Sequence, residues 1–445
     1  MNKKWIIFMV VIAFSLILTA DNGQPLQLEP EQEYVPNRAV IKISSDAVLE
    51  MEAVNLPHRP GEIRKDYPFS VLLHKYKSEI KHLQMHRIRD YYIAETTGGC
   101  DIEALCQRLR KEPYIADASP DYYAVLTSRI PDDTYFQYQY GLHNTGQVYL
   151  PETGLTGTAG SDIKAIDGWD WTTGSDDVII AIIDSGVAAD HEDLQFKIVP
   201  GRDYVNDDED PYDDHGHGTF AASIAAAETN NGVGIAGVSW NAKIMPIKVM
   251  ASTGYGSYLA IAEGMRYAVD HGAQVLNLSI GGRSPSFILE DACAYCYNNG
   301  AVIAAATGNT GSAVLYPAAY DDYCLAVAAT DANDERPNWS NYGPQVDVAG
   351  PGYFVWGANY SPDDPDNLDS YHWRSGTSFA TPHVAGAAAL LIAYKPFLTN
   401  DQVMALIKYT ADDVNASTHP GVDDFIGYGR INLQTLLGPY ELNDE

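Results

Sequence analysis

Basic residues are scarce in this chain of 445 residues, which has 28 Lys and Arg against 59 Asp and Glu and a net charge of -31. Most of the acidic excess lies in residues 130–445, which hold 12 basic and 42 acidic residues; residues 21–129 hold 14 and 17. Nucleic-acid binding is disfavoured, because phosphate contacts need Lys and Arg. Clustered carboxylates suit divalent cations or a saline medium, and an acidic surface is also an ordinary solubility device.

Long apolar runs are also scarce. The one long run, Trp5 to Leu18, follows Lys3 and Lys4 and is followed by Thr19 and Ala20. At about 14 apolar residues it is short for a membrane span and typical of a signal peptide. We therefore expect cleavage after Ala20 and a secreted or periplasmic protein; an uncleaved amino-terminal anchor is the alternative.

Cysteine is rare, with five residues in the whole chain: Cys100, Cys106, Cys293, Cys296 and Cys324. Five cysteines are compatible with a compartment in which disulfides form, but they do not show that any disulfide bond is present. We expect either Cys293 or Cys296, in a helix, to pair with Cys324 at the start of a buried strand. The alternative is that these thiols are free and buried.

Small residues dominate the stretch from Gly376 to Ala393, which contains one conspicuous hydroxyl, Ser378. The residues from Ala385 to Ala393 are apolar on every side and predict a buried helix. Ser378 would lie at the amino end of this helix, where free N–H groups and the macrodipole favour developing negative charge. Taken alone, the motif would equally suit a helix cap.

Two other segments supply partners for a serine nucleophile. The apolar run 178–183 predicts a buried parallel strand that ends at Asp184, at the sheet edge where α/β proteins place their sites. His217 precedes a helix of small residues and could act as the base that a serine needs. The neighbouring His215 is interpreted as a surface loop residue.

These three motifs, Asp-Ser-Gly at 184–186, His-Gly-Thr at 217–219 and Gly-Thr-Ser-x-Ala-Thr-Pro at 376–382, resemble in their order the subtilisin-like serine proteases, or subtilases. The resemblance implies that Asp184 orients His217, which activates Ser378. It also implies a doubly wound, mainly parallel α/β sheet preceded by a small α+β prodomain.

Asn309 follows another predicted buried strand, residues 301–306. The sequence Thr307-Gly308-Asn309 is similar to the Ala-Gly-Asn of subtilases, which implies that the Asn309 amide helps to bind the oxyanion. Phe379 departs from the family's usual methionine beside the nucleophile and removes a thioether that oxidises readily.

The predicted domain organisation follows from this resemblance. Residues 1–20 are expected to be the signal peptide and 130–437 the catalytic domain, followed by an acidic tail at 438–445. Residues 21–129, with a core at about 34–127, resemble the inhibitory propeptides of subtilases. The stretch Pro120–Arg129 would enter the cleft and be cut between Tyr123 and Pro131. A permanent accessory domain is the alternative.

Calcium is the one cofactor that the resemblance implies, in a structural role. Thermitase-type subtilases have acidic residues at matching positions, and carboxylates with loop carbonyls suit a hard cation. The first expected site comprises Asp133, Asp193 and Asn231 side chains with carbonyls of Thr229, Val233 and Ile235. A second, less complete set comprises Asp203, Asp208 and Asp210. Polar turns and a solvated acidic loop are the alternatives to these two sites.

The substrate cleft is predicted from two glycine-rich edges that could hold an extended peptide as an added strand. These edges and the first pocket comprise Gly254, Tyr255, Gly256, Ser279, Ile280, Gly281, Ala306, Thr307, Gly308 and Leu315. Leu315 suggests a shallow apolar pocket, and Tyr316-Pro317 matches a family cis-proline turn.

We therefore expect a monomeric, secreted serine endopeptidase that acts on extended peptides or proteins. It would be made as a zymogen with its own propeptide as inhibitor, and would bind neither nucleic acid nor membrane after export. The alternative is a catalytically silent subtilase-fold module that binds peptides. The sequence leaves the preferred residue at the cut and exopeptidase action open.

Overall fold

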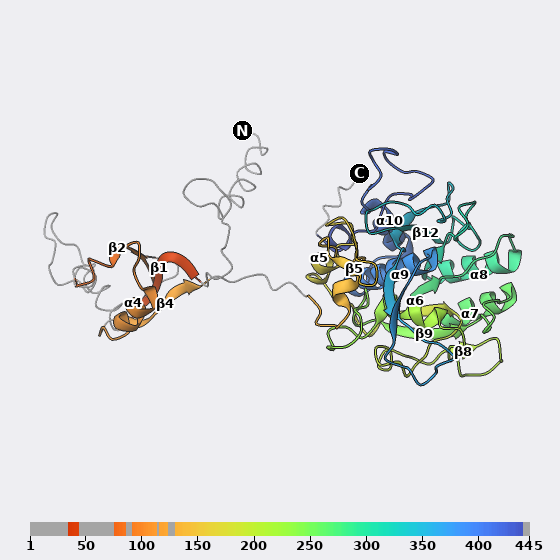
Figure 1. Cartoon of the computed structure of the whole chain (residues 1–445), viewed down its shortest axis with the longest axis horizontal. Coiled ribbons are helices and arrows are strands. Elements are labelled where there is room, and N and C mark those ends of the chain that lie inside the picture. Colours follow the sequence, from red (N-terminus) through yellow and green to blue (C-terminus); the bar gives the residue numbers. More distant parts are fainter. Residues whose placement is uncertain (1–33, 44–74, 86–90, 114, 123–129, 439–445) are drawn as a thin grey trace. The chain divides into compact units, whose positions relative to one another are not determined.

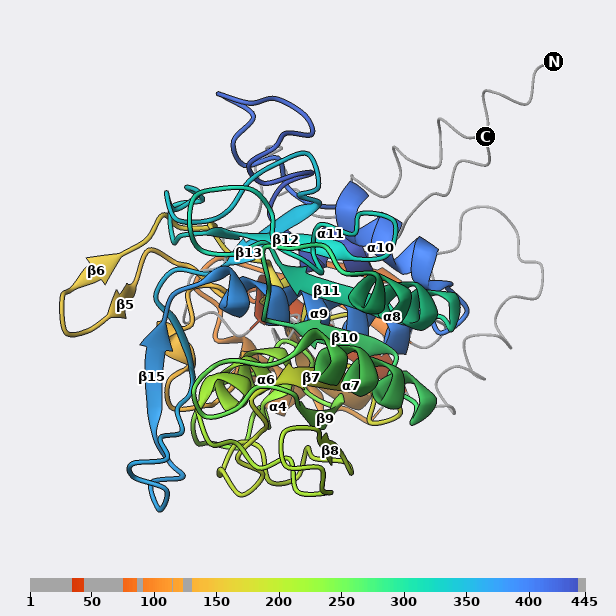
Figure 2. The same ribbon diagram turned by 90° about the vertical axis from the view of Figure 1, so that its right-hand side faces the viewer.

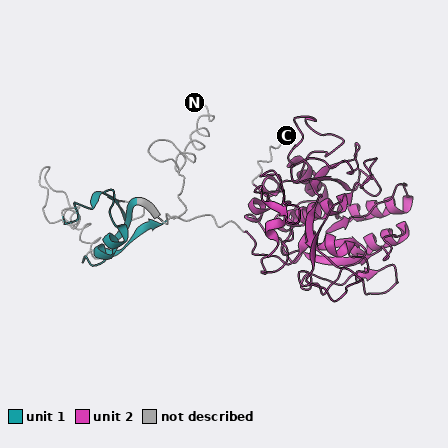
Figure 3. Cartoon of the chain, viewed as in Figure 1, with its two compact units in different colours: residues 1–127 teal, residues 128–445 magenta. Residues whose placement is uncertain are grey.

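A computed structural model describes residues 34–43, 75–85, 91–113, 115–122 and 130–438 of the chain. The chain forms two compact units, residues 1–127 and 128–445 (Figure 3). The expected signal peptide, most of the expected cleavage region and most of the acidic tail lie outside the described residues. Among the helices of the described ranges, none has the length and apolarity to cross a bilayer.

The first unit contains an antiparallel sheet of four strands in the order β2-β3-β1-β4, with one helix packed on it. Its elements are β1 (Tyr34–Ile43), β2 (Ile80–Met85), β3 (Tyr91–Thr96), α4 (Ile102–Leu109) and β4 (Ile115–Tyr122). Asp101 caps α4, because its side chain accepts a hydrogen bond of 2.9 Å from the Ala104 N–H. The apolar face of α4 is buried in one cluster with Ala39 and Ile41 of β1.

The second unit is built on a parallel sheet of seven strands in the order β13-β12-β11-β10-β7-β9-β8 (Figures 1 and 2). The strands are β7 (Ile179–Asp184), β8 (Arg202–Asp203), β9 (Lys243–Lys248), β10 (Val275–Leu278), β11 (Val302–Ala306), β12 (Leu325–Thr330) and β13 (Val348–Pro351). The strands that follow β7 in sequence, β8 and β9, lie on one side of it, and β10 lies on its other side. This switch point opens a crevice at the carboxyl ends of β7 and β10.

Alternating residues of β7 reach two separate apolar cores, as expected for a strand that is covered on both faces. Ile180 and Ile182 pack in the core that contains α6 (His217–Ala226) and α9 (Thr377–Tyr394). Ala181 and Ile183 pack in the core that contains α7 (Tyr258–Asp270) and α8 (Phe287–Asn298). The prediction of a doubly wound, mainly parallel α/β sheet is therefore confirmed.

Smaller elements complete the second unit. They are a 3₁₀ turn (Phe136–Tyr138), β5 (Val148–Leu150), β6 (Leu155–Thr156), α5 (Ala165–Trp169), β14 (Val355–Ala358), β15 (Tyr371–Arg374), α10 (Asn400–Tyr409) and α11 (Leu433–Leu437). β14 and β15 form an antiparallel ribbon. Residues 427–431 form isolated bridges rather than a strand: Arg430 bridges to Ala349 and Asp412, and Gly427 bridges to Asp423. The Tyr316–Pro317 peptide bond is cis, as expected.

All five cysteines are described, and all are free thiols. The sulfur atoms of Cys293 and Cys324 lie 3.9 Å apart within the core beside α8. The expected bond to Cys324 is therefore absent from this structure, and the alternative of free buried thiols holds. One of the two helical cysteines, Cys293, nevertheless lies next to Cys324, as predicted.

Candidate active site

Asp184 and His217 meet at the carboxyl end of β7. Asp184 is the last residue of this strand and His217 is the first residue of α6. The Nδ1 atom of His217 lies 2.8 Å from Oδ1 of Asp184, whose side chain is 1% exposed. This contact assigns the proton to Nδ1 and leaves Nε2 able to accept a proton. Burial alone would lower the pKa of His217, but the Asp184 carboxylate outweighs it and the pKa is raised.

A second carboxylate, Asp213, holds the loop that carries His217. Its oxygens accept five hydrogen bonds, from Ser185 Oγ, the N–H groups of His215, Gly216 and Thr219, and Thr219 Oγ1. One of these, from Ser185 Oγ at 2.9 Å, joins the loop directly to the end of β7. This role of Asp213 was not predicted from the sequence. Its place four residues before His217, close to a helix amino end, was the available signal.

Gly216 lets this loop pass close to its neighbours. Its φ is 87°, a conformation that other residues rarely adopt, and a Cβ atom there would lie 2.1 Å from the Tyr360 carbonyl oxygen. The glycine beside His217 is therefore required by both the backbone conformation and the available space.

Ser378 is the second residue of α9, and Gly376, rather than Ser378, precedes the helix as its cap residue. The Ser378 hydroxyl donates a hydrogen bond of 2.8 Å to the Ser279 carbonyl, and Ser279 Oγ donates one of 2.6 Å to the Ser378 carbonyl. This reciprocal pair joins the start of α9 to the end of β10. The next side chain, Phe379, lies against the His217 ring with a centroid distance of 5.3 Å. Rotation about the Ser378 Cα–Cβ bond would redirect its hydroxyl.

Asn309 follows β11 and is fixed by the first turn of α9. Its side-chain oxygen accepts hydrogen bonds from the Thr377 N–H at 2.8 Å and the Thr377 hydroxyl at 2.9 Å. The side-chain NH₂ group is left to face Gly376, where a Cβ atom would lie 3.3 Å from Nδ2. A donor from Asn309 thus lies beside the amino end of the helix that carries Ser378. The role of Thr377 was missed by the sequence reasoning.

The predicted pocket walls come together behind Ser378. Gly282 and Tyr316 exchange two backbone hydrogen bonds, of 2.8 and 2.9 Å, and Leu315 N–H donates to the Thr307 carbonyl at 3.0 Å. Leu315 fills the space between the walls, since a Cβ atom on Gly281 would lie 3.0 Å from Leu315 Cβ. Ala306 and Thr307 are buried, so their main chain rather than their side chains is available to line a pocket.

The other predicted edge lies beside the histidine loop. A Cβ atom on Gly254 would lie 3.3 Å from Nε2 of His215, and Tyr255 is 81% exposed. Gly254–Gly256 and Ser279–Gly281 are thus both joined by contacts to the segments that carry His217 and Ser378. An extended peptide would have a backbone edge available on each side.

The residues of the first expected cation site converge. The carboxylates of Asp133 and Asp193 are buried, at 5% and 0% exposure. Asp193 accepts hydrogen bonds from Asn231 Nδ2 at 3.0 Å and Ile235 N–H at 2.8 Å. Asp133 accepts one from Asn230 N–H at 2.8 Å, but its Oδ1 atom is buried and has no partner among the described residues.

This donor set fits a hard cation. Burial raises the pKa of Asp133 to about 6 and that of Asp193 to about 7, because desolvation disfavours the charged carboxylate, and the neighbouring carboxylates Asp132 and Asp133 add to the respective shifts. An orphaned carboxylate oxygen next to an amide and a backbone loop offers the oxygen ligands that Ca²⁺ takes. The carbonyls of Thr229, Val233 and Ile235 belong to the loop that closes on Asp193. Their role in binding calcium stays a prediction.

The second acidic set is arranged differently. Asp203 is buried, but its own loop supplies its partners, the N–H groups of Val205 at 2.6 Å and Asn206 at 2.9 Å. Asp208 and Asp210 are exposed. No group of three or more His, Cys, Asp or Glu side chains suited to a metal occurs within the described ranges. The second calcium site also stays a prediction, without structural support of the kind found at Asp133.

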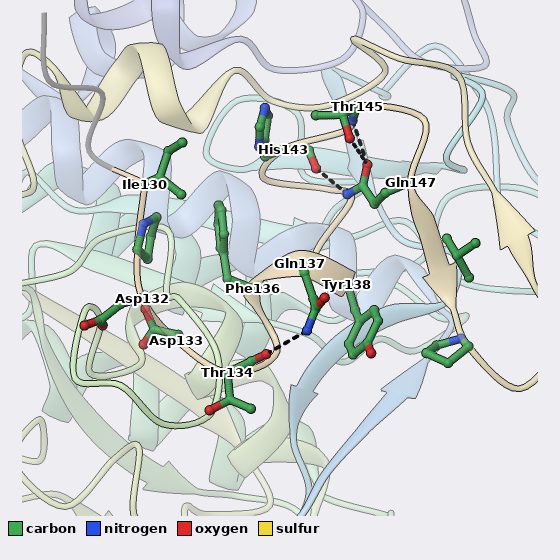
Figure 4. Close-up of a pocket in the computed structure, with 13 residues that line it drawn as sticks. Ile130, Asp132, Asp133, Thr134, Phe136, Gln137, Tyr138, His143, Thr145 and Gln147 are labelled. Carbon is green, nitrogen blue, oxygen red and sulfur yellow. Dashed lines mark hydrogen bonds between the residues drawn. The ribbon is translucent and has the colours of Figure 1, made fainter. Parts of the chain in front are cut away.

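A pocket of about 860 Å³ lies apart from these residues, at the start of the second unit (Figure 4). Its lining comes from residues 130–151 and includes Asp132, Phe136 and Tyr138. It contains none of Asp184, His217 and Ser378. Asp184 and His217 meet at the switch point rather than in this pocket, and Phe379, next to Ser378, contacts the His217 ring there.

Comparisons with known proteins agree with this geometry. The model of the subtilase family matches residues 175–429. A thermophilic serine proteinase from Bacillus sp. (strain AK1) is 39% identical over 334 residues, which cover 75% of each chain. Thermitase from Thermoactinomyces vulgaris is 42% identical over 271 residues, which cover 61% of this chain and 91% of thermitase.

The fold comparison gives the same answer. A solved protease structure from Pseudoalteromonas arctica superposes with a TM-score of 0.60 at 30% identity, covering 69% of this chain and 98% of that one. The chain therefore belongs to the subtilase family and is a subtilisin-like serine endopeptidase.

Proposed function

We propose that Asp184, His217 and Ser378 form the catalytic triad of this protease. The observation that carries the proposal is the 2.8 Å contact between His217 Nδ1 and Asp184, beside a helix whose first turn carries Ser378. A carboxylate on one side of the imidazole orients it and stabilises its protonated form. Nε2, on the other side, takes the proton of the Ser378 hydroxyl once that hydroxyl turns from the Ser279 carbonyl.

The reaction then follows two steps. Ser378 Oγ attacks the scissile carbonyl carbon, and the oxyanion is held by the Asn309 side-chain amide and the Ser378 N–H at the start of α9. His217 gives its proton to the leaving amine, which departs and leaves an acyl group on Ser378. A water molecule, deprotonated by His217, then releases the acyl group and restores the serine.

We also propose that the protein is secreted as a zymogen that processes itself. The amino-terminal apolar run supports export, and the separate first unit, of the size and α+β class of a subtilase propeptide, supports an inhibitor that folds by itself. Its tail would enter the cleft and be cut by Ser378. Structural calcium at Asp133 and Asp193 would stabilise the catalytic unit without taking part in the chemistry.

The test is expression of the full chain beside its Ser378→Ala variant. The wild-type chain should lose the first unit and hydrolyse casein and a peptide library at internal bonds. The variant should be secreted at full length and hydrolyse neither. Maturation of Ser378→Ala at the wild-type rate would contradict self-processing, and hydrolysis by the variant would contradict the nucleophile. Folded wild-type protein that binds peptides without cutting them would instead indicate a silent binding module.

A further inference from the structure

Arg374 places a guanidinium group beside the loop that carries His217. It is the last residue of β15 and lies two residues before Gly376. Its Nη2 atom lies 3.4 Å from the position that a Cβ atom would take on Gly216, which directly precedes His217. The guanidinium carbon also lies 5.0 Å from the ring centroid of Phe220, in the first turn of α6. A fixed cation therefore borders the proposed catalytic base.

This guanidinium is positioned but not neutralised. Among the described residues it makes one hydrogen bond, of 3.1 Å, to Asn359 Oδ1, and no carboxylate lies within 4.0 Å. The side chain is half-buried, yet none of its nitrogens is both buried and without a partner in the described ranges. The remaining N–H groups are thus available to solvent or to a ligand. Asn359 and the Phe220 ring fix the orientation in which those groups are presented.

Asp213 and Asp184 are the two carboxylates whose charges act on Arg374, and both already accept hydrogen bonds from other groups. Oδ1 of Asp184 bonds to His217 and the Ser185 N–H, each at 2.8 Å, whereas Oδ2 is buried without a hydrogen-bond partner among the described residues and forms no ion pair with Arg374. Asp213 accepts the five hydrogen bonds of the histidine loop. Neither can turn toward Arg374 without releasing that loop. The structure therefore presents a cation whose natural partner, a carboxylate, must come from outside.

The position of Arg374 indicates which part of a substrate it meets. The histidine loop has Gly254 beside His215 on one flank, and Arg374 with the Tyr360 carbonyl beside Gly216 on the other. Figure 2 likewise shows β15 and α7 on opposite sides of α6. We take the Gly254–Gly256 edge to hold the acyl part of the substrate as an added strand, so the flank of Arg374 faces the part that leaves. That part starts at the amine protonated by His217.

We propose that Arg374 determines specificity by binding an Asp or Glu side chain in the first two residues after the scissile bond. This rests on the proposed function of the same site. A guanidinium binds a carboxylate through two parallel N–H groups, a geometry that an amide side chain cannot reproduce. The difference between the enzyme with Arg374 and a variant without it should be large, because residues 130–445 are strongly acidic and would otherwise repel an acidic substrate.

The test is cleavage-site mapping by mass spectrometry on a peptide library, followed by kcat/KM for peptide pairs that differ only by Glu or Gln after the cut. Wild-type mature enzyme should prefer Glu over Gln by about tenfold, the worth of a hydrogen bond to a charged group. Arg374→Gln should abolish the preference, Arg374→Lys should retain part of it, and Arg374→Glu should reverse it toward Lys. High salt should weaken the wild-type preference.

Arg266→Gln is the matched control. Arg266 is also half-buried and lies 4.4 Å from the ring centroid of Tyr295. Within the described part of the chain it makes one hydrogen bond, to the Asp291 carbonyl, but it belongs to α7. Removing its charge should leave the Glu preference unchanged. Active-site titration with an organophosphonate shows that each variant is folded. A wild-type enzyme that cuts peptides without the Glu preference, or a preference that survives in Arg374→Gln, would overturn this proposal alone; absence of all cleavage would overturn the proposed function.

Discussion

The amide oxygen of Asn309 accepts two hydrogen bonds from Thr377, one from the backbone at 2.8 Å and one from the hydroxyl at 2.9 Å. The same hydroxyl accepts a hydrogen bond of 3.0 Å from the Gly308 N–H. Thr377 therefore ties the end of β11 to the start of α9 and decides which end of the Asn309 amide faces the oxyanion. The proposed donor and the proposed nucleophile are positioned by adjacent residues, Thr377 and Ser378.

The first prediction concerns this pair. Asn309→Ala should lower kcat by about 10²–10³ with little change in KM, the loss found for one such donor in subtilisin itself. Thr377→Val should lower kcat by about tenfold, because Asn309 loses one of its two anchors. Steady-state kinetics on one peptide substrate provides both values.

Thr381→Val is the control for Thr377→Val. Its hydroxyl is also buried and donates to the Thr377 carbonyl at 2.8 Å, one turn further along α9. Both variants should lose about 1 kcal/mol of unfolding free energy. Only Thr377→Val should lose kcat; equal kcat for the two variants would show that the Thr377 hydroxyl does not position Asn309.

The main chemical groups of the site could be predicted from the sequence because each follows a local pattern. Asp184 ends a buried apolar strand, His217 begins a helix of small residues, and Ser378 lies in the first turn of another. The contacts that orient them could not be predicted in this way. The hydroxyl of Thr377 and the amide of Asn309 are 68 residues apart, and Ser185 and Asp213 are 28 apart. Such pairs depend on side-chain geometry after folding.

The same distinction holds for the fold. Continuous apolar runs predicted the parallel strands, because strands covered on both faces have few polar residues. An approach of Cys293 or Cys296 to Cys324 was predicted and Cys293 makes it, but the presence of a bond depends on a few ångströms of backbone placement. The position of Arg374 beside the histidine loop could not be predicted from the sequence, because its neighbours Gly216 and Phe220 lie far from it in the chain.

A second prediction concerns the dependence of activity on pH. His217 must be neutral to accept a proton, and Asp184 raises its pKa, so kcat/KM should fall as pH decreases through a midpoint above the ordinary histidine value of about 6.5. Asp213 also raises this pKa and Arg374 lowers it. Arg374→Gln should therefore move the midpoint to higher pH, as measured from pH–rate profiles on an uncharged peptide.

Arg266→Gln should leave the midpoint in place, because that arginine lies on α7 and does not act on His217. A midpoint that stays constant in Arg374→Gln, or moves to lower pH, would show that the cation does not face the base. The profile is independent of the specificity test, because the substrate is uncharged.

A third prediction concerns calcium. A saturating chelator should lower the melting temperature of the mature enzyme by about 5 °C and speed self-digestion, because the buried carboxylates of Asp133 and Asp193 lose their counter-ion. Asp193→Asn should remove the response to added Ca²⁺ in thermal unfolding experiments.

Asp208→Asn is the comparison variant, because it removes an exposed carboxylate of the second acidic loop. It should respond to calcium like the wild-type enzyme if the Asp133–Asp193 site dominates. An unchanged melting temperature in saturating chelator would contradict both calcium sites.

A fourth prediction concerns oxidation. Phe379 is 5% exposed and lies 4.7 Å from the Phe220 ring and 5.3 Å from the His217 ring, as centroid distances. In Phe379→Met, peroxide would place a polar sulfoxide beside the base. The variant should lose activity in hydrogen peroxide at a concentration that the wild-type enzyme tolerates.

Phe379→Leu serves as the control, since it changes the same packing without a thioether. It should tolerate peroxide like the wild-type enzyme. Equal inactivation of the wild-type and Phe379→Met enzymes would contradict a protective role for Phe379.

The central claim is that one hydroxyl is activated by an imidazole that a carboxylate holds. Mass spectrometry after treatment of the mature enzyme with a peptidyl organophosphonate tests it most directly. We predict a single adduct, located on Ser378, whose rate of formation falls by orders of magnitude in His217→Ala. An unlabelled but folded wild-type enzyme, or an adduct on any other residue, would contradict the claim.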